Sequence, residues 1–192
     1  MDTNFIIIDN FYTNVDEVRE YALSQEFVTE GNYPGYRTGP ENDEQHEYIR
    51  AYFEQNVIGR PITYWPKEYN TAYQITTEDS KTWIHHDETM WAAVLYLTPD
   101  APVDSGTGIF RHKETGIYEW DRVKDSPSDF NHSDFLGDDS MDKWECINFS
   151  GNLYNRLVLY KGSLYHRSMV PGFGTDKYTG RLFQTFFFDT EF

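Results

Sequence analysis

The chain has 192 residues, of which 39% are hydrophobic and 18% aromatic, and its formal net charge is −16. This length suffices for one domain with a substantial core, and we expect residues 1–192 to form a single domain. The acidic excess repels phosphate backbones, which disfavours DNA and RNA as partners. The one cysteine, Cys146, excludes an internal disulfide framework and a cysteine-rich zinc site.

The first residues, Met1 to Asp9, lack the basic start and long apolar stretch of a signal peptide. No apolar run approaches the roughly 20 residues that a membrane-spanning helix needs. We therefore expect a soluble, cytoplasmic protein without membrane association. The sequence does not indicate an oligomeric state.

Residues 1–60 are predicted to form one strand and two supporting helices. An apolar, β-branched run predicts a strand over Phe5–Ile8. Asn14 is a suitable N-cap for a helix that ends at about Ser24, with acidic residues in its first turn. A second helix is predicted over about residues 43–57, with Gly59-Arg60-Pro61 ending it. Its expected inward residues are Tyr48, Ile49, Tyr52 and Phe53.

From residue 61 onward the pattern is typical of short strands. Runs rich in aromatic and β-branched residues predict strands over residues 62–65, 70–76, 91–97, 108–111, 157–161, 163–166 and 181–188. Residues 112–152 are polar and acidic, and we interpret them as a long inserted loop with one short helix near residues 141–146. Helices followed by many short strands predict an α+β, mainly β fold, with the helices packed on an antiparallel barrel or jelly roll.

Two separated histidine signals suggest a metal site. The segment Trp83-Ile84-His85-His86-Asp87-Glu88 contains His85-x-Asp87, and residues i and i+2 of an extended chain lie on the same side. His166 follows a strand and a tight turn at Gly162, so it could point into a barrel opposite the first pair. Two imidazoles and one carboxylate are the ligands of a mononuclear non-haem iron site with open positions.

Other interpretations of these histidines are available. His132-Ser133-Asp134 and His112-Lys113-Glu114 have the same spacing as His85-x-Asp87. His85-x-Asp87 is favoured because a strand-like segment, residues 91–97, follows it closely, whereas His132 has no flanking strand and a turn follows His112. Without a metal, His85 would be an exposed hairpin histidine and His166 a satisfied core histidine.

Arg181 begins an almost wholly apolar run that is typical of a strand buried on both faces. An arginine in this position needs an anionic partner, because burying an unpaired charge is costly. The partner is either one of the 32 acidic side chains or a dicarboxylate cosubstrate held by the guanidinium fork.

His85-x-Asp87, His166 and Arg181, the last after Met169-Val170-Pro171-Gly172 and Gly180, resemble the iron(II)/2-oxoglutarate-dependent dioxygenases, in particular their prolyl 4-hydroxylase branch. In that branch a tyrosine-bearing strand precedes His-x-Asp. The resemblance covers residues 70–188. Residues 4–23 are also similar to the opening of small oxygenases of this kind from phages and marine bacteria.

The resemblance implies a double-stranded β-helix (jelly-roll or cupin-like) core and an enzyme that uses Fe(II), 2-oxoglutarate and O2. Such an enzyme hydroxylates a C–H bond and releases succinate and CO2. The implied metal ligands are His85, Asp87 and His166. Arg181 would pair with the distal carboxylate of 2-oxoglutarate, and Tyr73 would donate its hydroxyl to the same cosubstrate.

The sequence departs from the family pattern between His166 and Arg181, where the interval is a few residues longer. Lys177 is therefore an alternative to Arg181 as the cosubstrate's cationic partner. Halogenation is disfavoured, because halogenating relatives lack the carboxylate ligand that Asp87 supplies. Two other functions remain open: a cupin-like barrel that binds another metal without 2-oxoglutarate, and a non-catalytic interaction module that presents Trp65, Trp83, Trp91 and Tyr165.

The substrate is expected to be a small molecule, an amino acid or a peptide side chain. Residues 31–44 and 112–152 are expected to frame its entrance, and their negative charge favours a cationic or zwitterionic substrate. For an anionic substrate, the sequence offers Arg156 and Arg167 as candidate partners.

Overall fold

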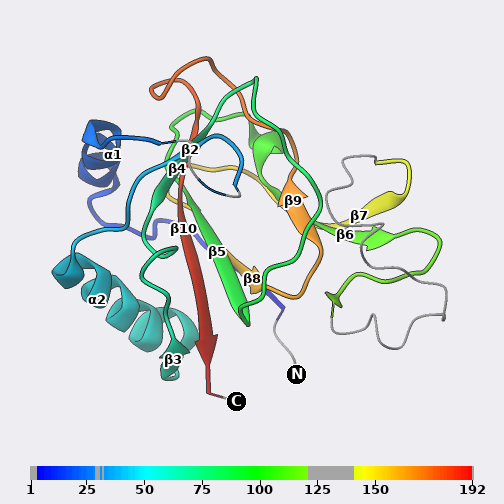
Figure 1. Cartoon of the computed structure of the whole chain (residues 1–192), viewed down its shortest axis with the longest axis horizontal. Helices are drawn as coiled ribbons and strands as arrows, with labels where there is room; N and C mark the ends of the chain where they lie inside the picture. Colours follow the sequence, from blue (N-terminus) through cyan, green and yellow to red (C-terminus); the bar gives the residue numbers. More distant parts are fainter. Residues whose placement is uncertain (1–3, 29–30, 32, 121–140, 192) are drawn as a thin grey trace.

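The computed structural model describes residues 4–28, 31, 33–120 and 141–191. Within these residues, a seven-stranded sheet and a three-stranded sheet form the core of the molecule, and every strand pair is antiparallel. Two helices lie to one side of the larger sheet (Figure 1). This is a mainly β jelly-roll arrangement with helices packed on it, so the predicted fold class is confirmed.

The long strand β10 (Arg181–Thr190) lies in the middle of the larger sheet and organises it. The order across this sheet is β1 (Phe5–Ile8), β8 (Leu157–Lys161), β5 (Trp91–Tyr96), β10, β4 (Tyr73–Thr76) and β2 (Tyr36–Arg37). Strand β3 (Ile62–Tyr64) pairs with the end of β10. The smaller sheet has the order β7 (Trp144–Ser150), β6 (Thr107–His112) and β9 (His166–Ser168).

Helices α1 (Val15–Ser24) and α2 (Asp43–Tyr52) cover the face of the larger sheet that is opposite the smaller sheet (Figure 1). Helix α2 continues as a π-helical segment, Phe53–Ile58, and ends at Gly59, whose φ of 67° is left-handed. The Phe53 ring packs 4.7 Å from that of Phe186 on β10, centroid to centroid. Contacts of this kind bury the apolar stripe of the helices against β10.

The helices agree with the prediction in position but not in every detail. Ile49 and Phe53 are buried as predicted, whereas Tyr48 is 62% exposed, so its predicted inward orientation is wrong. Asn14 precedes α1, but its side chain does not cap the helix and instead donates Nδ2 to Glu17. Asn42 does cap α2, because its Oδ1 accepts from the backbone N–H of Gln45 at 3.0 Å.

The predicted helix near residues 141–146 is wrong, because strand β7 occupies residues 144–150. Strand β7 pairs with β6 along the rim of the smaller sheet, and its central residues are exposed. Ladder hydrogen bonds from β6 stabilise this strand although its central residues are exposed, and nothing in the local sequence reveals that partner. The long inserted loop is therefore shorter than predicted, and residues 121–140 lie outside the described part of the chain.

Side chains alternate along β10 and β4, and this alternation separates two environments. Leu182, Phe186 and Phe188 of β10 belong to the core beneath the helices, together with Tyr73 and Ile75 of β4. The intervening residues face a cavity on the other side of the sheet, and these are Arg181, Phe183, Thr185, Phe187 and Asp189 of β10 and Gln74 and Thr76 of β4. Among the described residues, no helix is long and apolar enough to cross a membrane.

Candidate metal centre

A cavity of about 1180 Å³ lies against the inner face of the larger sheet. Strands β10, β4 and β8 line it from the larger sheet, and β6 and β9 contribute from the smaller one. The segment before β5, which includes His85 and Asp87, forms part of the wall together with His166 of β9. The side chains predicted to bind a metal therefore share one enclosed space with Arg181.

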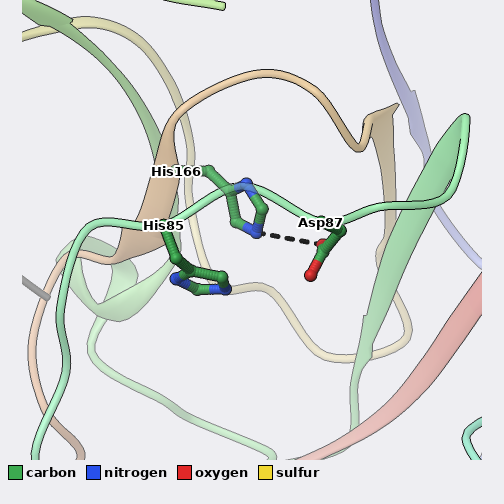
Figure 2. A group of neighbouring side chains, drawn as sticks. All are labelled: His85, Asp87 and His166. Atoms are coloured by element: carbon green, nitrogen blue, oxygen red, sulfur yellow. Dashed lines mark ion pairs between the residues drawn. The ribbon is translucent and has the colours of Figure 1, made fainter. Parts of the chain in front are cut away.

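His85, Asp87 and His166 converge on one point (Figure 2). Their candidate ligand atoms all lie within 4.8 Å of one another, and among the described residues they form the group of this kind that could hold a metal ion. His166 Nε2 is 3.3 Å from Asp87 Oδ2. This arrangement brings together the three residues that the sequence singled out from far-apart segments.

Backbone hydrogen bonds hold the three residues in register. His85 and His166 exchange backbone N–H···O bonds of 3.1 and 2.8 Å across an isolated bridge. The backbone N–H of Asp87 donates to the carbonyl of Gly162 at 2.8 Å. A Cβ on Gly162 would lie only 2.0 Å from the carbonyl oxygen of Thr89, so glycine permits this close approach of the two segments.

The two imidazoles are oriented as metal ligands usually are. His85 Nδ1 lies 3.1 Å from the carbonyl oxygen of Trp83, and His166 Nδ1 lies 2.8 Å from that of Leu164. A carbonyl oxygen only accepts, so each Nδ1 carries the proton and each Nε2 keeps its lone pair. Such outer partners fix the tautomer and ring orientation of histidine ligands.

The electrostatics of the site also suit a cation. Burial, followed by the neighbouring His166, lowers the pKa of His85 to about 4, so this imidazole is neutral at pH 7. Burial opposes ionisation of Asp87, but His166 and His85 outweigh it and hold the pKa of this carboxyl below its ordinary value. The neutral imidazole of His85 beside the ionised carboxylate of Asp87 has the protonation states that metal ligation requires.

Asp87 provides a direct test of whether a metal fits. Its Oδ2 is buried and faces His166 Nε2 at 3.3 Å, but that nitrogen carries no proton to donate in the tautomer that the Leu164 carbonyl fixes. A buried carboxylate oxygen without a partner is costly, and a cation at the convergence point would satisfy it. The residues present therefore fit a divalent metal bound by two nitrogens and one oxygen.

Arg181 is 3% exposed, and its guanidinium faces the cavity. Nε donates to the carbonyl oxygen of Ser105 at 3.0 Å, and the guanidinium carbon lies 4.4 Å from the centre of the Phe183 ring. Burial lowers the pKa of this guanidinium. No carboxylate of the described residues lies within ion-pair distance, so the protein itself does not supply the acidic partner that the sequence allowed.

The structure corrects the prediction that Tyr73 donates its hydroxyl to the cosubstrate. Its side chain lies on the helix-covered face of β4, and its hydroxyl donates to Glu41 at 2.7 Å. The alternation along β4 makes its neighbour Gln74, not Tyr73, a cavity residue. The buried Tyr160 of β8 lines the cavity instead, with its ring 4.5 Å from that of His166, and its alternation with Leu159 is the signal that could have indicated it.

Several alternatives from the sequence lie elsewhere. Lys177 donates to the carbonyl oxygen of Leu23 at 2.6 Å and does not line the cavity. His112 is buried against Trp144, and Thr115 contacts its Nδ1 at 3.0 Å, whereas His132 lies outside the described residues. Of the two arginines considered for an anionic substrate, Arg156 pairs with Asp9, whereas Arg167 does line the cavity.

The structure also bears on the expected aromatic recognition surface and on the segments expected to frame the substrate entrance. Trp65 packs in the helix-covered core and Tyr165 is fully buried, so these aromatic residues form no common recognition surface with Trp83 and Trp91. Of the expected entrance segment 31–44, the residues that line the cavity are Gly31, Tyr33, Pro34, Arg37 and Thr38. Of residues 112–152, none that the structure describes does so.

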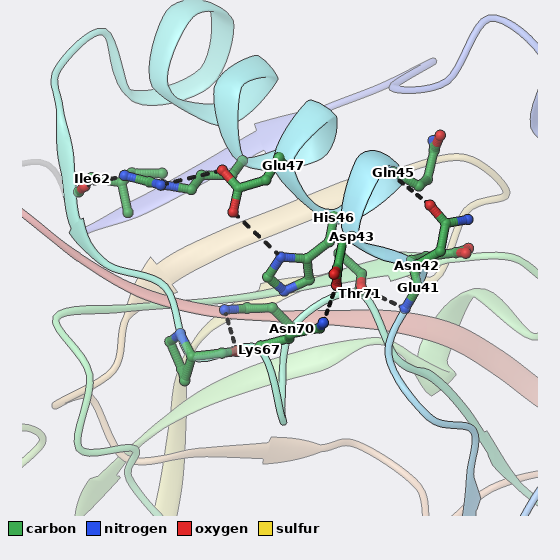
Figure 3. Close-up of polar contacts among 12 residues, drawn as sticks. Glu41, Asn42, Asp43, Gln45, His46, Glu47, Ile62, Lys67, Asn70 and Thr71 are labelled. Atoms are coloured by element: carbon green, nitrogen blue, oxygen red, sulfur yellow. Dashed lines mark hydrogen bonds and ion pairs between the residues drawn. The ribbon is translucent and has the colours of Figure 1, made fainter.

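One wall of the cavity is attached to helix α2. Pro66 and Tyr69 line the cavity, and the segment that carries them is held by Asn70, whose Nδ2 donates to the carbonyl oxygens of Pro66 and Phe187 at 3.0 and 2.8 Å. Lys67 pairs with Asp43 in the first turn of α2, as Figure 3 shows. The helix thus stabilises a segment that shapes the cavity.

Comparison with known proteins places the chain in a family and identifies similar folds. The model of a family of unknown function (DUF6445) matches residues 1–188. No curated protein matches the chain in sequence.

Solved structures with a similar fold include HygX from Streptomyces hygroscopicus with nickel and 2-oxoglutarate bound. It has a TM-score of 0.62 and 12% identity, over 99% of this chain and 84% of HygX. A prolyl hydroxylase from Trichoplax adhaerens, in complex with a peptide of hypoxia inducible factor, has a TM-score of 0.56 and 15% identity over 97% and 84%. The non-haem α-ketoglutarate-dependent epimerase SnoN has a TM-score of 0.56 and 14% identity over 96% and 77%. These likenesses show a shared fold.

Proposed function

We propose that this chain, which belongs to the DUF6445 family, is an Fe(II)- and 2-oxoglutarate-dependent oxygenase that hydroxylates a C–H bond. The observation that carries this proposal is the combination of two features in one cavity: a converging His-Asp-His group, and a buried arginine that no described carboxylate neutralises. Either feature alone has a structural explanation. Together they match the metal and the dicarboxylate that such an oxygenase binds.

In this proposal His85, Asp87 and His166 would hold the metal through two nitrogens and one oxygen, a ligand set typical of non-haem Fe(II) oxygenases. When bound, Fe(II) with 2-oxoglutarate and O2 supplies the oxidising chemistry, and succinate and CO2 are released. The carbonyl oxygens of Trp83 and Leu164 hold the two imidazole rings so that both Nε2 atoms face the metal.

Arg181 binds the distal carboxylate of 2-oxoglutarate. The carbonyl oxygen of Ser105 holds Nε, which directs the terminal nitrogens of the guanidinium to a carboxylate even though the side chain also contacts Tyr96. The Phe183 ring beneath the guanidinium keeps water from this side, which strengthens the ion pair. Tyr160, rather than Tyr73, is the hydroxyl donor on the cavity face that can contact the same cosubstrate.

The shared fold supports this proposal, since the HygX structure contains nickel and 2-oxoglutarate and SnoN is an α-ketoglutarate-dependent epimerase. A fold alone does not determine function, and the argument therefore depends on the site residues of this chain. The molecules bound in the similar structures, hygromycin B in HygX and a peptide in the prolyl hydroxylase, differ in kind and do not indicate the substrate here.

Anaerobic spectroscopy tests the proposal. Fe(II) and then 2-oxoglutarate are added to metal-free protein, and the weak visible charge-transfer band of the chelate is recorded. We expect a band that is lost in His85→Ala, that needs a much higher 2-oxoglutarate concentration in Arg181→Ala, and that is unchanged in Arg111→Ala. Arg111 is a suitable control because it pairs with Glu145 on the surface, away from the cavity.

Other results would favour the remaining functions. Iron binding without a band at any 2-oxoglutarate concentration would favour a barrel with another metal chemistry. A protein that binds no divalent metal, and whose stability His85→Ala does not change in the presence of metal, would favour a non-catalytic module.

A further inference from the structure

A second arginine, Arg37, lines the same cavity from the edge strand β2. It lies opposite Gln74 in the pairing of β2 with β4. Gln74 Oε1 accepts hydrogen bonds from Arg37 Nε at 3.0 Å and from Nη2 at 2.5 Å. The guanidinium carbon of Arg37 lies 4.2 Å from the centre of the Tyr33 ring.

Gln74 is itself held in place, so the guanidinium of Arg37 has a defined orientation. Gln74 is 2% exposed, and its Nε2 donates to the carbonyl oxygen of Pro34 at 2.7 Å. A guanidinium has five N–H groups, of which Gln74 accepts from two nitrogens. The remaining N–H groups, including both on Nη1, have no acceptor among the described residues.

Arg37 is also without a negative partner. No carboxylate of the described residues forms an ion pair with it, although Asp87 is near enough to act on its charge. Burial lowers the pKa of Arg37, as expected for a cation that is partly removed from water. By contrast, Arg50, Arg111 and Arg156 each pair with a carboxylate. In a chain with 32 acidic residues, an orientated and unpaired arginine in a cavity is best explained by an anion from outside the protein.

The cosubstrate does not account for this arginine. In the proposed function, one carboxylate of 2-oxoglutarate lies at the metal and the other at Arg181. Arg181 contacts Ser105 and the rings of Phe183 and Tyr96, whereas Arg37 lies two strands from β10, roughly 10 Å away at ordinary strand spacing. Two separate guanidinium groups require two separate anionic groups.

We propose that Arg37 binds a carboxylate of the primary substrate, so that this substrate is a small carboxylic acid. This inference rests on the proposed function. It excludes a purely cationic substrate, and it is compatible with the zwitterionic substrate that the surface charge also favoured. A singly charged carboxylate fits better than a phosphate, because the cavity wall also carries Glu68, Glu88 and Asp189, which oppose a second negative charge that lacks a cationic partner. Each carboxylate of 2-oxoglutarate has such a partner, at the metal or at Arg181. The paired N–H geometry of a guanidinium suits a planar carboxylate.

Matched probe pairs test the assignment without knowledge of the physiological substrate. The probes are free L-amino acids and small aliphatic and aromatic carboxylic acids, each beside its carboxamide. Binding is followed by the change in the Fe(II)–2-oxoglutarate band and, independently, by the melting temperature of the metal-free protein. Failure of the proposed function would be evident before any probe is added, because the wild-type protein would then show no band.

We expect acids in the panel to bind at least about tenfold more tightly than their carboxamides to the wild-type protein. Arg37→Gln should abolish this difference and leave the affinity for 2-oxoglutarate unchanged, and Arg37→Lys should retain part of it. Gln74→Glu is a second variant, because an internal carboxylate beside Arg37 should compete with the acids. The remote Arg111→Gln is the control and should behave like wild type.

Three results would overturn the assignment. These are carboxamides that bind as tightly as their acids, a panel in which no acid binds, and an Arg37→Gln variant whose main defect is weaker 2-oxoglutarate binding. The last would make Arg37 part of the cosubstrate site. Circular dichroism of each variant shows whether a loss of binding accompanies a loss of fold.

Discussion

Replacement of Arg181 by methionine should separate the stability of the protein from its binding function. Arg181 is 3% exposed, and in the metal-free protein its charge has one carbonyl acceptor and two aromatic neighbours but no described carboxylate. Apolar residues that replace buried charged groups are often neutral or stabilising by about 1–4 kcal/mol. Methionine has a similar length and no charge, so we expect Arg181→Met to unfold at the same or a higher urea concentration than wild type.

With metal and 2-oxoglutarate bound, wild type should instead be more stable than Arg181→Met. A ligand at 100 times its dissociation constant stabilises the native state by about 2.7 kcal/mol. With a divalent metal and 2-oxoglutarate present, wild type should gain stability of about this size. Arg181→Met should gain only the stability that metal binding contributes, because it lacks the cationic partner of 2-oxoglutarate. Urea unfolding curves with metal alone and with metal plus 2-oxoglutarate measure this difference directly.

The reasoning would be refuted by a ligand-free Arg181→Met protein that is less stable than wild type by more than about 1 kcal/mol, since truncating a satisfied buried charge is destabilising. Arg111→Met is the matched control, because Arg111 is exposed and paired on the surface. Its unfolding free energy should change by less than about 0.5 kcal/mol.

The remaining predictions concern the cavity wall and the core. Tyr160→Phe should weaken 2-oxoglutarate binding severalfold in the anaerobic titration, whereas Tyr73→Phe should leave it unchanged. Weaker binding in Tyr73→Phe and unchanged binding in Tyr160→Phe would instead support Tyr73 as the hydroxyl donor to 2-oxoglutarate. Gly162→Ala should lower metal affinity in calorimetry, because its Cβ would push the Thr89 segment and move Asp87; unchanged affinity would contradict this. Phe53→Ala should lower the unfolding free energy by about 3–5 kcal/mol in urea, and a cost below about 1 kcal/mol would show that the fully buried Phe53 ring is not central to the core.

Local patterns in the sequence were sufficient to single out the three candidate metal ligands that the structure brings together, and to locate most elements. His85 and Asp87 are two residues apart, and a spacing of two in extended chain decides by itself that both side chains share a side. The apolar runs of β5, β8 and β10 are long and continuous, so their existence follows from burial alone. His166 was found because its ligand chemistry and the Gly162 turn are both visible in the sequence.

Only the tertiary structure decided which face of a strand meets the cavity. Alternation shows that Tyr73 and Gln74 lie on opposite sides of β4, but it does not show which side the helices cover. Strand β7 was missed because its stability comes from pairing with β6, a contact that local propensity does not report. Net charge is likewise an average over the whole surface. A chain with a charge of −16 still gathers Arg37 and Arg181 around one cavity, because burial and hydrogen bonding act on individual side chains at short range.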